Sequence, residues 1–274
     1  MQSGRPHRMM SVGTVVSRAL GGKSTHRAVL GQPSADPGSG LRWVSGRLLR
    51  VTVFVGVIGG PGSGKSTLCT ALAGHYEAAG QAVDHFREEE ILSRPEFSRV
   101  AAEFGDGSGS VAPQTLIDGF SRYVDRSVAD DIDLVITDAL FPFIPSLLVW
   151  GHSEAEIARV VAELEEASAA LTVIMVLLAA DPAVTLQRAV EREGPGWIDG
   201  YIKKLSQGSG TSHVVNRSTA IDQLRREADV TRRLINQDRW TLVEVDATAS
   251  AHAMTALVKR RLDAVLTGSA PAES

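Results

Sequence analysis

The stretch VFVGVIGGPGSGKSTL at positions 53–68 joins a buried-strand pattern to a glycine-rich loop and the first turn of a helix. Residues 51–58 are apolar and mostly β-branched over the length of one strand, as in a parallel strand covered on both faces. Residues 67–80 continue with helical spacing and end at Gly80. Strand, glycine loop and helix, in that order, are the context that a phosphate-binding loop requires.

The loop itself matches the pattern Gly-x-x-x-x-Gly-Lys-Ser/Thr. Glycines let successive N–H groups curl around a phosphate, and the helix that begins near Lys65 adds its positive end. Lys65 is expected to reach the β- and γ-phosphates of a nucleotide, and the Ser66 hydroxyl is expected to ligate Mg²⁺. The predicted nucleotide-binding residues are Gly59, Gly60, Pro61, Gly62, Ser63, Gly64, Lys65, Ser66 and Thr67.

A second Gly-Lys-Ser-Thr string occurs at residues 22–25. Ser17 stands where the pattern needs its first glycine, and no apolar strand precedes the string. We interpret this string as coincidence.

Composition limits the class of protein. The chain has 274 residues and a net charge of −4, but residues 1–50 carry +7 and the remainder −11. An acidic body argues against a nucleic-acid partner. No run of about 20 apolar residues predicts a membrane span. The single cysteine, Cys69, excludes an internal disulfide and suits a cytoplasmic location; we expect it to pack in the core.

The pattern of elements predicts an α/β fold. Further strands are expected at 81–86, 133–140, 171–179 and 240–247, with helices at 153–171, 182–194 and 249–266. The alternation predicts a three-layer structure, a five-stranded parallel sheet with helices on both faces and ligands at the carboxyl ends of the strands. Residues 51–268 would form this domain, before a flexible tail at 269–274. Residues 1–50 would be a disordered basic extension, a start placed too far upstream, or a targeting peptide.

Three stretches resemble one family. The loop GGPGSGKST, the segment AADPAVTLQRAVEREG at 179–194 and the ending WTLVEVDAT at 240–248 are similar to the nucleoside and nucleoside-monophosphate kinase group. The thymidylate-kinase and deoxynucleoside-kinase branch is the most similar part of this group. The resemblance covers 51–266 and implies the kinase variant of the P-loop NTPase fold. The guanine-reading string Asn-Lys-x-Asp of GTPases does not occur.

Asp138 ends the third strand, after its apolar residues, and is expected to hold Mg²⁺ through water together with Ser66. A helix cap or a turn aspartate is the alternative role. The segment DALFPF at 138–143 lacks the Asp-Arg-Tyr of thymidylate kinases, which puts thymidylate specificity in doubt. Phe141 or Phe143 would stack on a planar substrate or pack in the core. His152 precedes a helix start capped by Ser153 and is expected to be structural.

The resemblance also implies a proton acceptor and a lid. Among the acidic residues at 84–90, Glu88 is the predicted base and Asp84 the next candidate. Arg188 and Arg192 lie four residues apart and stand where lid arginines grip the transferred phosphoryl group; pairing with neighbouring glutamates is the alternative. The lid would cover about 193–215, or this segment would be a plain surface loop.

We therefore expect an ATP- and Mg²⁺-dependent kinase acting on a small-molecule phosphate acceptor, a nucleoside or nucleoside monophosphate. A kinase of a non-nucleotide metabolite or antibiotic is the alternative in chemistry, and a nucleotide-dependent switch is the alternative in class. The sequence does not determine the identity of the acceptor, whether ATP or GTP is the donor, or whether the protein is a homodimer.

Overall fold

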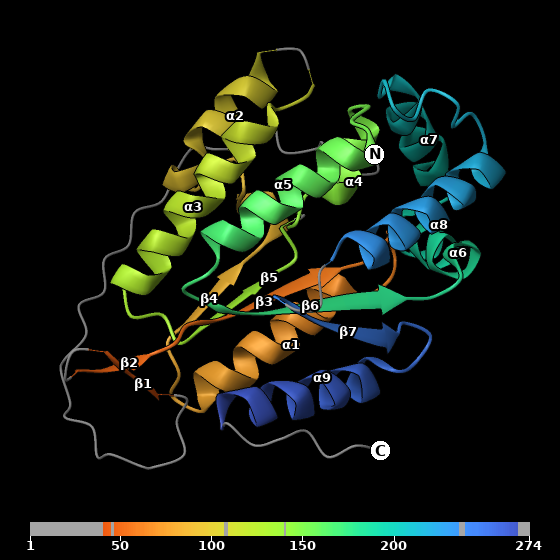
Figure 1. Ribbon diagram of the computed structural model, residues 1–274. Helices are drawn as coiled ribbons and strands as arrows, with labels where there is room; N and C mark the ends of the chain where they lie inside the picture. Colours follow the sequence, from red (N-terminus) through yellow and green to blue (C-terminus); the bar gives the residue numbers. More distant parts are fainter. Residues whose placement is uncertain (1–40, 45–46, 107–108, 140, 236–238, 268–274) are drawn as a thin grey trace, which may run out of the picture.

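The five apolar stretches form one sheet in the computed structural model, which describes residues 41–44, 47–106, 109–139, 141–235 and 239–267. The strands are β3 (Val53–Ile58), β4 (Val83–Phe86), β5 (Leu134–Thr137), β6 (Thr172–Ala179) and β7 (Thr241–Asp246). Their order is β4-β5-β3-β6-β7 and all neighbours are parallel (Figure 1). The predicted five-stranded parallel sheet is confirmed.

Strand β3 lies in the centre of this sheet, with β5 on one side and β6 on the other. After β3 the chain forms β4 and β5 on one side of it, and then crosses to form β6 and β7 on the other side. The carboxyl end of β3 is therefore a topological switch point. Ligands of open parallel sheets bind at such points. The loop after β3 is the predicted phosphate-binding loop, so topology and motif indicate the same place.

Helices cover both faces of the sheet. Helix α1 (Lys65–Ala78) and helix α9 (Ala251–Leu266) cover one face, and α3 (Pro113–Ala129), α5 (Glu154–Ala167) and α8 (Arg217–Leu234) lie over the other (Figure 1). Alternate residues of β3 divide between the two cores, since Phe54 packs with α3 and α5 whereas Val55 packs with α1 and α9. Cys69 is fully buried in the second core, which confirms its predicted packing role.

The remaining elements are shorter. They are the helices α2 (Ser98–Gly105), α4 (Ile144–Val149), α6 (Pro182–Glu193) and α7 (Trp197–Gln207), and the 3₁₀ turns Glu88–Glu90 and Pro95–Phe97.

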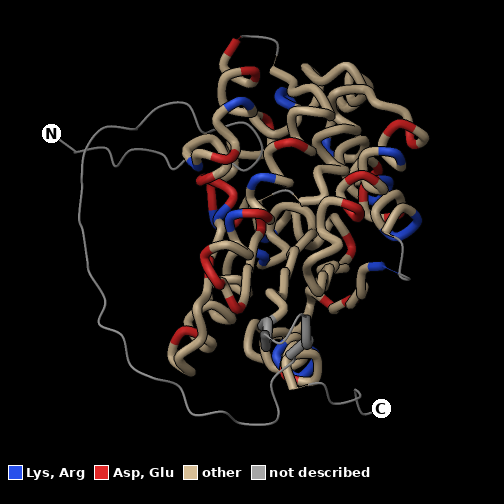
Figure 2. Tube along the Cα trace, turned by 60° about the vertical axis from the view of Figure 1, so that its left-hand side comes forward, with Lys and Arg blue, Asp and Glu red and all other residues tan. Residues whose placement is uncertain are grey.

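Lys and Arg are interspersed with Asp and Glu along the chain (Figure 2). Within the described residues, none of the helices has the length and apolar character needed to cross a bilayer.

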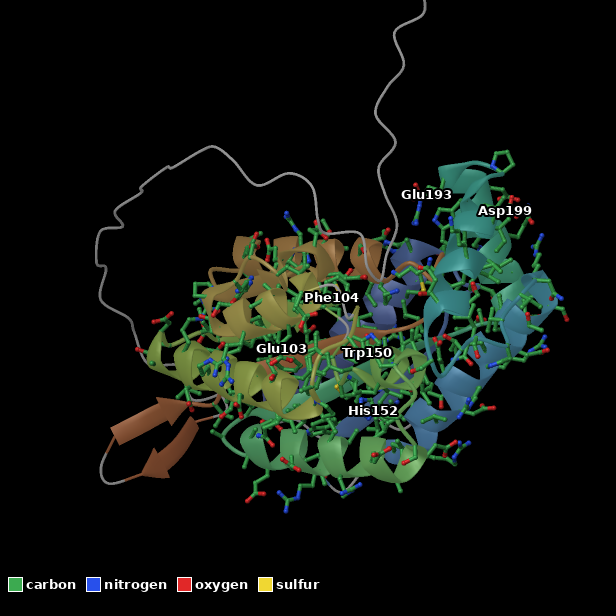
Figure 3. The ribbon with its side chains drawn as sticks, turned by 90° about the horizontal axis from the view of Figure 1, so that it is seen from above. Glu103, Phe104, Trp150, His152, Glu193 and Asp199 are labelled. Atoms are coloured by element: carbon green, nitrogen blue, oxygen red, sulfur yellow. The ribbon has the colours of Figure 1, made fainter. Side chains whose placement is uncertain are left out.

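The segment predicted as a lid contains a helix. Residues 197–207 form α7, and the stacked rings of Trp197 and Tyr201, 5.0 Å apart, pack in a third apolar cluster with residues of α6 and α8. Figure 3 shows Glu193 and Asp199 at the outer edge of this unit, which we call the α6–α8 unit (182–234). The unit is therefore a packed helical layer beside the carboxyl ends of β3 and β6.

Most residues at the two ends of the chain lie outside the described ranges. Strands β1 (Leu41–Val44) and β2 (Arg47–Arg50) pair antiparallel within the expected basic extension. The rest of that extension, 1–40, and the expected tail, 269–274, lie outside the described residues.

Candidate active site

The loop between β3 and α1 has a conformation that needs glycine. Gly62 and Gly64 have φ values of 75° and 95°, which L side chains rarely adopt. A Cβ atom on Gly62 would lie 2.0 Å from the carbonyl oxygen of Thr185, so the loop also packs against the backbone at the start of α6. The motif glycines thus permit both the turn and the close approach of the helix beside it.

Lys65 begins α1 and folds back over the loop. Its Nζ donates a hydrogen bond to the carbonyl oxygen of Gly59 at 2.7 Å and approaches that of Gly60 at 3.5 Å. The ammonium group is thereby held beside the backbone N–H groups at the helix start. A cation beside the N-terminus of a helix suits a polyphosphate.

Ser66 and Asp138 meet across the end of the sheet. The Ser66 hydroxyl donates to Oδ2 of Asp138 at 2.6 Å, and the backbone N–H of Glu88 donates to Oδ1 at 3.0 Å. Asp138 is only 3% exposed, so these two donors fix its carboxylate at the carboxyl end of β5. The structure thus brings together Ser66, Asp138 and the backbone of Glu88.

This donor set fits Mg²⁺. Mg²⁺ prefers oxygen ligands and is usually held by one or two protein groups together with substrate phosphates and waters. Ser66 and Asp138 supply a hydroxyl and a carboxylate beside the phosphate-binding loop. Among the described residues no group of three or more His, Cys, Asp or Glu side chains is placed for a metal, so a dedicated protein cage is not formed there.

Lys204 of α7 was not identified from the sequence as a site residue. Partial burial lowers the pKa of the Lys204 ammonium to about 8, and the negative charge of Glu88 opposes that shift. Since the backbone of Glu88 holds Asp138, Lys204 brings a positive charge from the α6–α8 unit toward the same site.

Glu227 of α8 is a second residue that the sequence did not reveal. Burial raises the pKa of its carboxyl group to about 7, although Lys65 and Arg226 partly offset the rise. Gln223, one turn earlier, donates to Glu227 Oε1 at 3.0 Å. A carboxyl group that titrates near neutral pH beside the loop lysine has the properties of a proton acceptor.

Asp84 has a structural environment. Its carboxylate receives hydrogen bonds from Arg94 in a bidentate pair, from Arg126 and from the Tyr123 hydroxyl, all at 2.7–2.9 Å. The hydrogen bonds and charges of these partners outweigh burial and lower the pKa of Asp84. A strongly paired carboxylate with a lowered pKa is a poor base at neutral pH.

The two predicted lid arginines, Arg188 and Arg192, bind different partners. Arg188 donates to the carbonyl oxygen of Ala247, after β7, at 2.5 Å. Arg192 pairs with Glu193 at 2.7 Å and is 64% exposed. The pairing alternative therefore describes Arg192, whereas Arg188 ties α6 to the loop after the last strand.

The predicted aromatic pair lies in the core. Phe141 and Phe143 are buried, and Phe141 stacks on Phe120 with ring centroids 4.4 Å apart. The space among these rings is only about 10 Å³. Core packing is therefore the role that the structure gives to Phe141 and Phe143. The capping box of Ser153 and Glu156 beside His152 is also confirmed.

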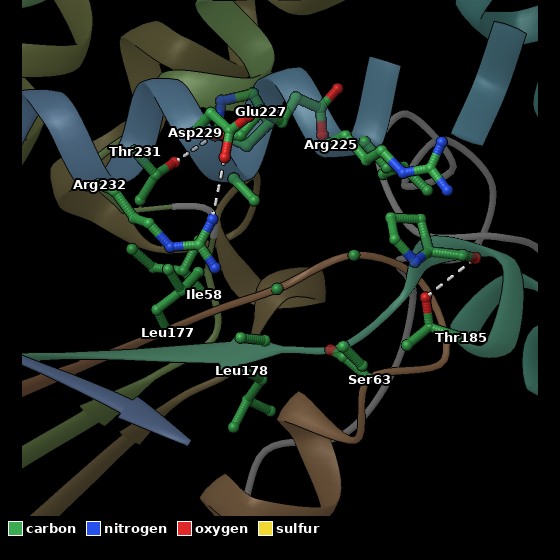
Figure 4. Close-up of a pocket in the computed structure, with 18 residues that line it drawn as sticks. Ile58, Ser63, Leu177, Leu178, Thr185, Arg225, Glu227, Asp229, Thr231 and Arg232 are labelled. Carbon is green, nitrogen blue, oxygen red and sulfur yellow. Dashed lines mark hydrogen bonds and ion pairs between the residues drawn. The ribbon is translucent and has the colours of Figure 1, made fainter. Parts of the chain in front are cut away.

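A larger cavity of about 260 Å³ lies beside the loop, between α8 and the carboxyl ends of β3 and β6 (Figure 4). Ser63 of the loop lines it, and the buried Ser63 hydroxyl has no hydrogen-bond partner among the described residues. Buried polar groups of native proteins are normally paired, so an unpaired hydroxyl at a cavity wall indicates a place for a ligand or water.

The fold is similar to those of solved structures, one of which is described here. The chain is similar to the structure of a deoxyadenosine kinase from M. mycoides, described with products dCMP and a flexible dCDP bound. The two sequences are 12% identical, the match covers 77% of this chain and 100% of the other, and the TM-score is 0.44. No protein-family model and no curated protein matches the sequence.

Proposed function

We propose that this protein is an ATP- and Mg²⁺-dependent phosphotransferase that transfers the γ-phosphoryl group to a small molecule. The observation that carries the proposal is the joint placement of Lys65, Ser66 and Asp138 around one glycine-rich loop at the switch point of the sheet. These groups form the constellation that phosphoryl transfer needs: N–H donors, one cation, and oxygen ligands for Mg²⁺.

Each residue then has a defined task. The loop N–H groups and Lys65 bind the polyphosphate and neutralise its charge, and Ser66 and Asp138 would hold the metal ion. When bound, Mg²⁺ supplies charge neutralisation of the phosphate oxygens. Catalysis is then positioning together with electrostatic stabilisation. The sequence resemblance assigns the base to Glu88, whose backbone N–H is bonded to Asp138.

A nucleoside or nucleoside monophosphate remains the acceptor that the resemblance implies. One observation favours the alternative of a non-nucleotide acceptor: Phe141 and Phe143, the aromatic residues nearest to Asp138 in sequence, are packed against each other and Phe120. They leave no room between them for a base.

The test is acceptor-stimulated release of ADP from ATP and Mg²⁺ by the full chain, compared with Lys65→Ala. We expect stimulated release by the wild type and a loss of about 10²-fold or more in the variant, at unchanged far-UV circular dichroism. Near-full activity of Lys65→Ala would exclude the assignment.

A further inference from the structure

The cavity beside the loop has a predominantly apolar wall. Ile58 of β3, Leu177 of β6 and Leu224 of α8 line it together with Pro145 and Pro182. Figure 4 shows Ile58, Leu177 and Ser63 on the strand and loop side, and Asp229, Arg225 and Arg232 on the α8 side. A concave apolar wall with a few polar groups is typical of a small-molecule site.

The size of the cavity limits its ligand. An apolar cavity of about 150 Å³ is known to hold benzene. A volume of about 260 Å³ therefore suits a group of about ten non-hydrogen atoms. This is smaller than the usual range for drug-sized ligands, which begins at about 300 Å³.

Two polar groups of the wall, the Ser63 hydroxyl and the Glu227 carboxyl, are suited to bind a ligand. Ser63 is 2% exposed, and its hydroxyl has no hydrogen-bond partner within the described part of the chain, so it can bind an oxygen of a ligand. The Glu227 carboxyl also lines the cavity and lies close enough to Lys65 for their charges to interact. Both groups are suited to a hydroxyl, which donates one hydrogen bond and accepts others.

The cations of the wall are already neutralised. Arg232 pairs with Asp229 at 3.0 Å and with Glu244 at 2.9 Å. Arg225 pairs with Asp222 at 3.1 Å and with Asp181 at 3.4 Å. An anion such as a phosphate monoester would need a cation with unsatisfied charge, and it would also meet the negative charge of Glu227. The wall thus favours an uncharged ligand.

The cavity adjoins the phosphate-binding loop directly. Gly59 and Gly60 line it, and their carbonyl oxygens are the ones that hold Lys65 Nζ. A ligand hydroxyl between Ser63 and Glu227 would therefore lie next to the group expected to bind the β- and γ-phosphates.

We infer that this cavity binds the phosphate acceptor, and that the acceptor is a neutral alcohol with an apolar body whose hydroxyl faces Glu227. The inference rests on the proposed function. In the transfer step the acceptor oxygen forms a bond to the γ-phosphorus, and the bond from that phosphorus to the β,γ-bridging oxygen breaks. The electron pair of the broken bond leaves with ADP, and the acceptor proton passes to the Glu227 carboxylate, so Glu227 takes the role predicted for Glu88.

The test fills the cavity from α8. Ala228 lines the cavity from α8, so Ala228→Phe should fill the acceptor space. Ala228→Leu is a milder version, and Ser218→Phe, on the exposed part of the same helix, is the matched control. The acceptor panel contains benzyl alcohol, 2-phenylethanol, thymidine and thymidine monophosphate, each with ATP and Mg²⁺.

We expect at least one neutral alcohol to be phosphorylated by the wild type. Ala228→Phe should lower kcat/KM for that alcohol by about ten-fold or more, while the Kd for ATP changes by less than about two-fold. Ala228→Leu should have an intermediate effect and Ser218→Phe none.

If both Ala228 variants phosphorylate the alcohol as fast as the wild type, the inference is overturned and the proposed function stands. A preference for thymidine monophosphate over every neutral compound would have the same consequence. Absence of transfer to every compound in the panel would overturn the proposed function and this inference together.

Discussion

The hydroxyl of Ser66 and the carboxylate of Asp138, 72 residues apart in the chain, share a hydrogen bond of 2.6 Å. Ser66 lies in the first turn of α1, and Asp138 directly follows β5, so the bond joins the loop after the central strand to the neighbouring strand. Because Asp138 also accepts the backbone N–H of Glu88, three segments converge on one buried carboxylate.

Replacement of Asp138 by Asn should weaken Mg²⁺ binding. The amide keeps the size of the side chain but loses the negative charge and one acceptor for Ser66. We expect the Mg²⁺ concentration for half-maximal activity to rise by about 10- to 100-fold, measured as ADP release against Mg²⁺. Asp130→Asn, an exposed residue at the end of α3, is the control and should behave as wild type. An unchanged Mg²⁺ dependence of Asp138→Asn would argue against the metal role.

Loss of the Lys204 charge should slow transfer without weakening ATP binding. Its ammonium group lies within electrostatic reach of Glu88 at the site, and a cation placed there stabilises the charge of the transition state. We expect Lys204→Met to lower kcat by about 10²-fold with a small change in the Kd for ATP.

Lys203→Met is the matched control, because Lys203 is the exposed neighbour on the same helix. The pH profile gives a second readout. Since the pKa of Lys204 is lowered to about 8, the wild type should lose activity above about pH 8, and Lys204→Met should lack that alkaline decline. Equal kcat values for Lys204→Met and Lys203→Met would show that Lys204 takes no part in the reaction.

Glu227→Gln should stabilise the fold at high pH while it lowers activity. The pKa of Glu227 is about 7 when folded and about 4.5 when unfolded, so the folded state binds the extra proton. The burial penalty is therefore absent below about pH 4.5, grows as pH rises to about 7, and is constant above it.

The gain in the free energy of unfolding of Glu227→Gln should reach about 1–3 kcal/mol at pH 8 and vanish at pH 4, measured by urea denaturation. Asp222→Asn, an exposed acid on the same helix, should show no such pH-dependent gain. Activity should fall in Glu227→Gln and persist in Glu88→Gln; the reverse result would return the role of base to Glu88.

The sheet and the loop were predictable because their sequence signals are local. Buried parallel strands such as β3 and β6 are continuous apolar runs, and the loop has fixed spacing around Gly59 and Gly64. Asp138 was found because it follows such a run. These features need no knowledge of distant contacts.

The acceptor side was not predictable for the opposite reason. Helix α8 carries many charged residues and few apolar ones, so its sequence resembles a solvated helix, and nothing local marks Glu227 as buried. Nor does the acidic run at 84–90 show that Asp84 pairs with Arg94, 10 residues later in the chain, and with Arg126 on α3. In both cases tertiary packing sets the charge state.

Transfer of label from ATP carrying ³²P at the γ-position tests the central claim most directly. The full chain, Mg²⁺ and the acceptor panel would be incubated together, and the label followed by thin-layer chromatography. The account predicts label on a small-molecule phosphate ester, formed in step with ADP and lost in Lys65→Ala. Tight binding of ATP with label remaining in ATP, or released only as inorganic phosphate, would contradict it and favour a nucleotide-dependent switch.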